Sequence, residues 1–184
     1  MTHSRDCEIR RAAVLALGMI GGAAEIQVVG KCLRDPDRCV RLLAEIAFGD
    51  LSRRQFGVPA ARELASIRRH LDGRRYEKAI ALLQQLTSAR TDFAEAWYQL
   101  AIATFANSDF RSAVQFAQRA LEINKYHFAA HALVARCWVE LDEPTRALRS
   151  FEASYFVNPS QIVVKGYIDK IKRAARRFNT DNPL

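Results

Sequence analysis

A spacing of 34 residues constrains this sequence more than any other feature. Ala79, Ala113 and Ala147 follow one another at that interval. After Ala79 and Ala113, apolar residues recur at i+3, i+4 and i+7, which places them on one face of a helix. The sequence Asn-Ser-Asp at positions 107–109 interrupts this pattern, as expected for a turn that ends in a helix N-cap. The repeat therefore predicts stacked helix–turn–helix units.

Two consecutive units, at residues 94–127 and 128–161, resemble the tetratricopeptide repeat. The first has the family's characteristic places filled by Trp97, Leu100, Ala101, Thr104, Ala113 and Ala117. In the second they are filled by His131, Val134, Ala135, Trp138, Ala147, Phe151 and Pro159. A further unit, residues 60–93, matches clearly only in its second helix. Shifting its first helix by one residue replaces Glu63 with Leu64, Ile67 and Leu71 on the apolar face, so we prefer that register.

A second repeat, with an interval of 31 residues, occupies the N-terminal segment. Its recurring residues are Asp6, Ile9, Arg10, Ala13, Ala16 and Gly18, matched by Asp37, Val40, Arg41, Ala44, Ala47 and Gly49. This pattern resembles the short HEAT repeats of phycobilisome lyases. We expect the aspartates to cap helices and the arginines to bond neighbouring turns. Ile9, Ala13, Ala16 and Leu17 should face the partner helix, and both glycines should end helices.

The predicted fold class is all-α, a right-handed α-solenoid of helix–turn–helix repeats. HEAT-like helices at residues 1–50 lead through an ordered junction at 51–59 into a tetratricopeptide array at 60–184, closed by a capping helix at about 162–177. Stacked repeats need about three units for stability. The HEAT-like helices should therefore dock on the array or belong to a longer solenoid. An ordinary antiparallel helical bundle is the alternative fold.

Composition narrows the functional classes. The net charge of +8 permits an acidic partner or nucleic acid. No apolar run is long enough to span a membrane, so we expect no membrane association. The four cysteines, Cys7, Cys32, Cys39 and Cys137, lack the spacing of zinc ligands. We interpret them as reduced, mostly buried thiols of a cytoplasmic protein.

No recognisable catalytic motif is present, and the sequence predicts no enzyme activity, metal site or cofactor. The histidines, His3, His70, His127 and His131, lie in no nucleophile or metal-binding pattern. His131 takes the family's tryptophan place and is expected to be a packed core residue.

The resemblance to tetratricopeptide repeats implies a concave groove lined by the first helix of each unit. Mapping the family's ligand-facing places gives Arg68, Tyr98, Ile102, Phe105, Arg136, Glu140 and Lys170. An apolar strip flanked by cations suits a short acidic or amphipathic peptide. The alternative is that Tyr98 and Phe105 are ordinary core between repeats.

The predicted function is therefore non-catalytic protein binding, as a scaffold or adaptor that takes a protein or peptide partner. A basic solenoid that binds RNA or another phosphate-rich partner is the alternative. The sequence argues against it because no continuous basic stripe with interleaved aromatic residues is visible. Self-association, or assembly into a larger complex, is the third interpretation.

Overall fold

The computed structural model describes the backbone of residues 1–181 and the side chains of residues 1–176. Over these residues the chain forms ten α-helices and one short 3-10 helix, η1. In chain order they are α1 (Cys7–Ile20), η1 (Ala23–Glu25), α2 (Ile26–Cys32), α3 (Arg38–Arg54), α4 (Gly57–Asp72), α5 (Tyr76–Ala89), α6 (Ala94–Ala106), α7 (Phe110–Ile123), α8 (Phe128–Glu140), α9 (Pro144–Val157) and α10 (Ile162–Asp181). Within the described chain, no helix combines the length and apolar character needed to cross a membrane.

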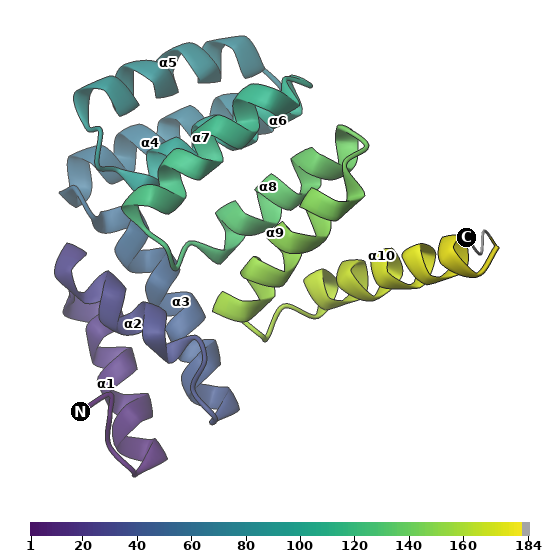
Figure 1. The fold of residues 1–184 in the computed structure, drawn as a ribbon. Coiled ribbons are helices and arrows are strands. Elements are labelled where there is room, and N and C mark those ends of the chain that lie inside the picture. The colour runs from purple at the N-terminus through teal and green to yellow at the C-terminus, as the bar shows by residue number, and fades with distance from the viewer. Residues whose placement is uncertain (182–184) are drawn as a thin grey trace.

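The helices from α4 to α9 form three stacked antiparallel pairs, and α10 follows the third pair (Figure 1). Helices α1, α2 and α3 lie together at the N-terminal end of this stack, with α3 leading directly into α4 (Figure 1). The arrangement is an α-solenoid and confirms the predicted fold class. Helix α10 extends to Asp181, beyond its predicted end near residue 177.

The turn inside each helix pair repeats with the same backbone geometry. Arg74, Ser108 and Asp142 have φ values of 55°, 63° and 56°, and they lie 34 residues apart. These left-handed residues end the first helix, so the next amide can reach back to a carbonyl of its last turn. The amide of Asp109 donates to the carbonyl of Thr104 at 3.0 Å, and that of Glu143 donates to Trp138 at 2.9 Å. The sequence repeat is therefore a repeat of turn conformation as well as of side-chain size.

Small side chains set the separation of the helices in the middle unit. Ala101, Ala113 and Ala117 are fully buried and share one apolar cluster with Val134. The methyl groups of these alanines occupy places where a longer side chain would meet the neighbouring helix. The apolar phase predicted for this unit is confirmed.

Replacing Ala113 with leucine should lower the free energy of unfolding by about 1–3 kcal/mol, because the cluster has no room for the added atoms. The matched control is Gln118→Leu on the exposed face of the same helix, where the change should stay within about 0.5 kcal/mol. Urea denaturation, monitored by circular dichroism, measures the free energy of unfolding of both variants. Equal losses at the two positions would contradict the assigned helix phase.

Burial also decides between the two registers considered for α4, the first helix of the array. Leu64 and Ile67 of α4 are 2% and 3% exposed, and Leu71 packs against the same cluster, whereas Glu63 is exposed. The shifted register is therefore confirmed. Helix α4 ends at Asp72, with Gly73 as its C-cap, where the sequence predicted the break.

Several predictions for the N-terminal helices are confirmed. The Asp6 carboxylate accepts from the amide of Glu8, and Asp37 accepts from that of Val40, so both aspartates cap helices. The Arg10 guanidinium donates to Asp35 and to the carbonyl of Ser4. Arg41 donates likewise to the carbonyls of the 35–36 turn. Both arginines therefore hold loops in place.

The predicted role of the two glycines is wrong. Helix α1 continues to Ile20 and α3 to Arg54, so Gly18 and Gly49 lie inside helices. At Gly18 an added Cβ would lie 2.8 Å from the Cβ of Ala47. Glycine is present there because α1 and α3 approach closely, not because a helix ends.

The predicted inner face of α1 is also partly wrong. Val14 is the fully buried residue, whereas Ile9 is 44% exposed and Ala16 is exposed. Helix α1 is the outermost element on this side of the structure, so it contacts α3 through one narrow stripe only. Ile9 and Ala16 lie outside this stripe and are therefore exposed.

The predicted junction at 51–59 is mostly helical. Only Gln55 and Phe56 separate α3 from α4, because the apolar residues near the end of α3, such as Leu51, are fully buried and keep the helix intact. The Phe56 ring lies 4.9 Å from that of Phe93, so it packs on the array as expected. The division of the chain into separate HEAT-like and tetratricopeptide domains stays a prediction.

The N-terminal helices share a core with the array. Residues of α1, α2 and α3, including Val29 and Leu51, form one cluster with Val157 of α9, and Tyr126 and Phe128 pack against it. This contact supports docking of the first helices on the array. Of the four thiols, Cys32 and Cys137 are buried, Cys7 is half-buried and Cys39 is exposed, so only half of them are as buried as predicted.

Candidate functional site

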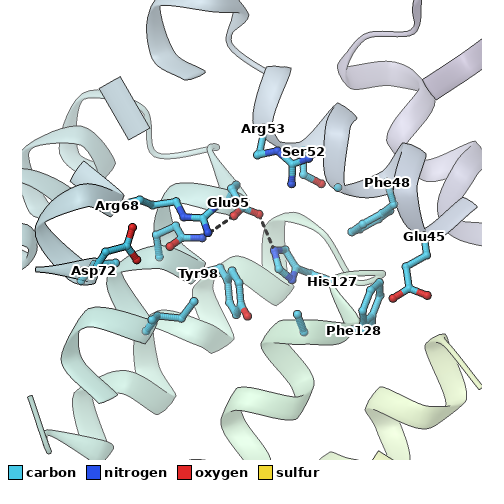
Figure 2. A pocket seen from close by; sticks show the side chains of 15 residues that line it. Glu45, Phe48, Ser52, Arg53, Arg68, Asp72, Glu95, Tyr98, His127 and Phe128 are labelled. Carbon is cyan, nitrogen blue, oxygen red and sulfur yellow. Dashed lines mark hydrogen bonds and ion pairs between the residues drawn. The ribbon is translucent and has the colours of Figure 1, made fainter. Parts of the chain in front are cut away.

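A hollow of about 370 Å³ lies between α3 and the first helices of the repeats (Figure 2). Helix α3 forms one wall, and α4, α6 and the start of α8 form the others. The side chains that line it include Glu45, Phe48, Ser52, Arg53, Arg68, Asp72, Glu95, Tyr98, Gln99, Ile102, His127 and Phe128. We call this hollow the inner groove.

The fold places the groove at the centre of the stack. Helix α6 is packed by α4, α5, α7 and α8, and α3 contacts it as well. Small residues such as Ala96 and Ala103 let its neighbours approach closely. Its remaining face carries Glu95, Tyr98 and Ile102 at helical spacing, and this face forms the floor of the inner groove.

A buried polar cluster anchors the groove wall. His127 Nε2 lies 3.3 Å from Glu95 Oε2, and Gln99 donates to Glu95 Oε1 at 2.8 Å. His127 is also the N-cap of α8, where its Nδ1 accepts from the amide of Ala130 at 3.2 Å. An amide can only donate, so Nδ1 is the acceptor and the ring proton on Nε2 donates to Glu95. The cap thereby fixes both the tautomer and the direction of the ring.

The carboxylate of Glu95 stays ionised in this setting. Burial alone would raise its pKa, but the hydrogen bonds from His127 and Gln99, together with nearby positive charge, lower the pKa below its ordinary value. A group with a lowered folded-state pKa stabilises the fold above its ordinary pKa, and this contribution is lost as the pH falls through the folded value. The cluster should therefore weaken only in acid.

Aromatic rings surround the histidine. The Tyr98 ring lies 4.5 Å from the imidazole, and Phe48 approaches it edge-on at 6.1 Å. The ring centroids of Phe48 and Phe128 are 6.0 Å apart, so these two rings also pack together. Burial raises the pKa of Tyr98 to about 12, so its hydroxyl remains a hydrogen-bond donor at neutral pH. The groove therefore offers rings together with a small number of oriented polar groups.

Two further polar groups face the groove. The hydroxyl of Ser52 is buried and has no hydrogen-bond partner among the described residues. Arg68 is exposed at the rim and forms no ion pair within residues 1–176. Arg53, by contrast, is paired with Asp50 at 2.6 Å. The Arg68 guanidinium is thus free to bond an incoming group, whereas the Ser52 hydroxyl is enclosed by the fold.

The predicted site residues fall into two groups. Arg68, Tyr98 and Ile102 line the inner groove. Phe105 packs against Phe110 at 5.3 Å, with the Arg136 guanidinium 4.6 Å from its ring centroid, and neither lines the hollow.

Glu140 and Lys170 lie further from the inner groove. Glu140 is exposed at the last position of α8, and Lys170 lies beside Tyr167 on α10. The structure therefore brings together three of the seven predicted residues. A binding role stays a prediction for all seven.

The α3 wall and the histidine were missed by sequence reasoning. Phe48 and Ser52 belong to the N-terminal repeat, and its apolar pattern does not reveal which part of the array it docks against. His127 precedes a helix, but histidine is not a usual N-cap residue and gave no signal. Within the described residues, no group of three potential metal ligands is close enough to hold an ion.

Comparison with known proteins supports a tetratricopeptide-type array. Residues 72–154 match the family model of the anaphase-promoting complex, cyclosome, subunit 3. No curated protein matches the sequence. The HEAT-like character of α1, α2 and α3 is not supported by these comparisons and stays a prediction.

Solved structures share the fold. The Yersinia enterocolitica type III secretion chaperone SycD, in complex with a peptide of the translocator YopD, has a TM-score of 0.59 at 12% identity, covering 62% of this chain and 92% of SycD. MamA has a TM-score of 0.54 at 18% identity, covering 88% of this chain and 97% of MamA. A mutant of MamA has the same TM-score at 13% identity, covering 97% of this chain and 95% of that one.

Proposed function

We propose that this protein is a non-catalytic interaction module that binds a short peptide of a partner protein in the inner groove. The observation that carries the proposal is the groove itself, a hollow of about 370 Å³ with Tyr98 and Ile102 on its floor and Arg68 on its rim. Concave sites with an apolar floor and a few convergent polar groups are typical of ligand binding.

The chemistry of the groove indicates what the peptide should look like. Tyr98, Phe48 and Phe128 offer rings to an apolar side chain. The exposed Arg68 guanidinium suits a carboxylate of the peptide. Because acidic residues also line the rim, including Asp72, an amphipathic peptide with an acidic end fits better than a uniformly acidic one.

The likeness to a peptide-bound chaperone agrees with this proposal. SycD was solved with a peptide of its translocator, and its fold resembles that of this chain. At 12% identity this likeness concerns the fold alone, so the groove residues carry the argument here.

Replacing Tyr98 with alanine should weaken peptide binding by about 1–2 kcal/mol, or roughly 5–30-fold, because the peptide loses its aromatic anchor. The probe is a fluorescein-labelled peptide selected against the protein from a random display library. Fluorescence anisotropy measures its affinity at low and high salt. The loss should persist at high salt, since the contact is apolar. Tyr98→Phe, which retains the ring, should bind within about threefold of the wild type.

A triple variant on the exposed face of α10, with Lys172, Arg173 and Arg176 replaced by glutamine, provides the control for general charge. It should leave peptide affinity nearly unchanged, because these side chains lie outside the inner groove. If the triple variant abolishes binding while Tyr98→Ala binds normally, the proposed site is wrong.

A further inference from the structure

A second hollow, of about 870 Å³, lies between α2, the turn that joins α7 to α8, and α9, and it shares no residue with the inner groove. Lys31, Arg34 and Lys125 line it together with the rings of Tyr126 and Phe156. We infer that this hollow, the basic–aromatic hollow, binds single-stranded nucleic acid. The inference is independent of peptide binding in the inner groove.

The hollow carries an excess of positive charge. Its three cations come from three places: Lys31 from the last turn of α2, Arg34 from the loop after it, and Lys125 from the turn before α8. The acidic residue in its lining is Glu152, and this carboxylate is paired with the Lys172 ammonium group at 2.6 Å. The cations of the hollow are therefore available to phosphate groups.

Two aromatic rings of the hollow each have a cation at a ring face. The Arg34 guanidinium lies 3.9 Å from the centroid of Phe156, a side chain that is 63% exposed. The ammonium group of Lys125 lies 5.4 Å from the centroid of Tyr126. Exposed rings beside guanidinium planes are the surfaces on which unpaired bases stack, with cations nearby for the backbone.

A close helix contact assembles this surface. Gly30 lies against Tyr126, and an added Cβ would come within 2.5 Å of the ring. Glycine at this position thus lets α2 approach the α7–α8 turn. The approach places Lys31 on the same side as Lys125, although the two are far apart in the sequence. This is why no basic stripe with aromatic residues was visible in the sequence.

Positive charge continues from the hollow along α10. The ion pair between Lys172 and Glu152 places α10 beside the hollow. The spacing of Lys165 and Arg176 puts two further exposed cations on the face of that helix that carries Lys172, whose own charge is paired with Glu152. A strand with one base in the hollow could therefore extend its phosphates along this face. A compact acidic peptide would need only the three cations of the hollow itself, Lys31, Arg34 and Lys125.

The test uses fluorescein-labelled oligouridylate and oligodeoxyuridylate of about ten nucleotides, which differ only in the 2′-hydroxyl and whose length is within the range of known single-strand sites. Anisotropy is measured with the full chain at about 50 mM and 200 mM salt. We expect binding that weakens steeply with salt through counterion release. Tighter binding of the uridylate would identify RNA as the ligand, and equal binding would mean that the 2′-hydroxyl is not used. No detectable binding of either at the lower salt would overturn the inference.

Two double variants separate the hollow from general charge. Replacing Lys31 and Arg34 with glutamine should weaken binding at least about tenfold and reduce the salt slope by about 0.7 per lost phosphate contact. Replacing Arg62 and Lys78, exposed cations of the array, changes the net charge equally and should cost less than about twofold. Equal losses from both pairs would contradict the inference.

The aromatic part of the hollow is tested separately. Phe156→Ala should weaken single-strand binding at least about fivefold, because a base loses its stacking partner, and circular dichroism should show an unchanged fold. A polyglutamate of similar charge should displace the oligonucleotide poorly. Full displacement by polyglutamate, or unchanged affinity in Phe156→Ala, would mean that the hollow recognises acidic protein rather than bases.

Discussion

Replacing His127 with alanine should lower the free energy of unfolding by about 3–5 kcal/mol, the largest effect of any single substitution considered for this protein. The change leaves the buried Glu95 carboxylate without its main partner and removes the N-cap of α8. It also deletes the ring that packs between Tyr98 and Phe48. Urea denaturation at neutral pH measures the loss.

The double variant Glu95→Gln/His127→Ala provides the matched control. It removes the buried charge together with its partner, so it should be more stable than His127→Ala alone. If the single and double variants unfold at the same urea concentration, the unpaired Glu95 carboxylate does not destabilise the fold. The effect of His127 would then come from packing and capping only.

The N-terminal helices should not fold without the array. A fragment of residues 1–56 should lack cooperative thermal unfolding in far-ultraviolet circular dichroism, whereas residues 57–184 should remain helical. The first three helices share their core with Val157, Tyr126 and Phe128, all of which lie beyond residue 56. Without these contacts too little apolar surface is buried to offset the entropy of ordering the chain. A fragment of residues 1–56 that melts cooperatively would contradict this dependence.

The repeat architecture could be predicted from the sequence because its determinants are local. The 34-residue interval fixes the turns at Arg74, Ser108 and Asp142, and alanines such as Ala113 fix the helix separation. Neighbouring units contact one another in chain order, so spacing alone gives the stack. The same reasoning selected the correct register for α4, where Leu64 and Ile67 are buried.

Features that depend on docking could not be predicted in this way. Gly18 was predicted to end a helix, but Gly18 and Gly30 each mark a place where another segment approaches closely. The sequence predicted a junction from residue 51, yet α3 continues to Arg54 with Leu51 and Ser52 buried. Because α3 then forms one wall of the inner groove, its residues Phe48 and Ser52 were missed as site residues.

The candidate site was therefore only partly visible in the sequence. Family spacing indicated Tyr98 and Ile102, because their positions on α6 follow from the repeat alone. It gave no sign of the bond between His127 and Glu95, which joins two successive units. Phe105 follows from the same spacing, but it packs against Phe110 and does not line the inner groove, so its binding role stays a prediction.

The most direct test of peptide binding in the inner groove is photo-crosslinking. A library-selected peptide that carries benzoylphenylalanine at its apolar anchor position is irradiated with the full chain, and the modified residues are identified by mass spectrometry. We expect crosslinks to Tyr98, Ile102 or Phe128, competed by unlabelled peptide and lost in Tyr98→Ala. Crosslinks confined to the basic–aromatic hollow, at Tyr126 or Phe156, would contradict the proposal.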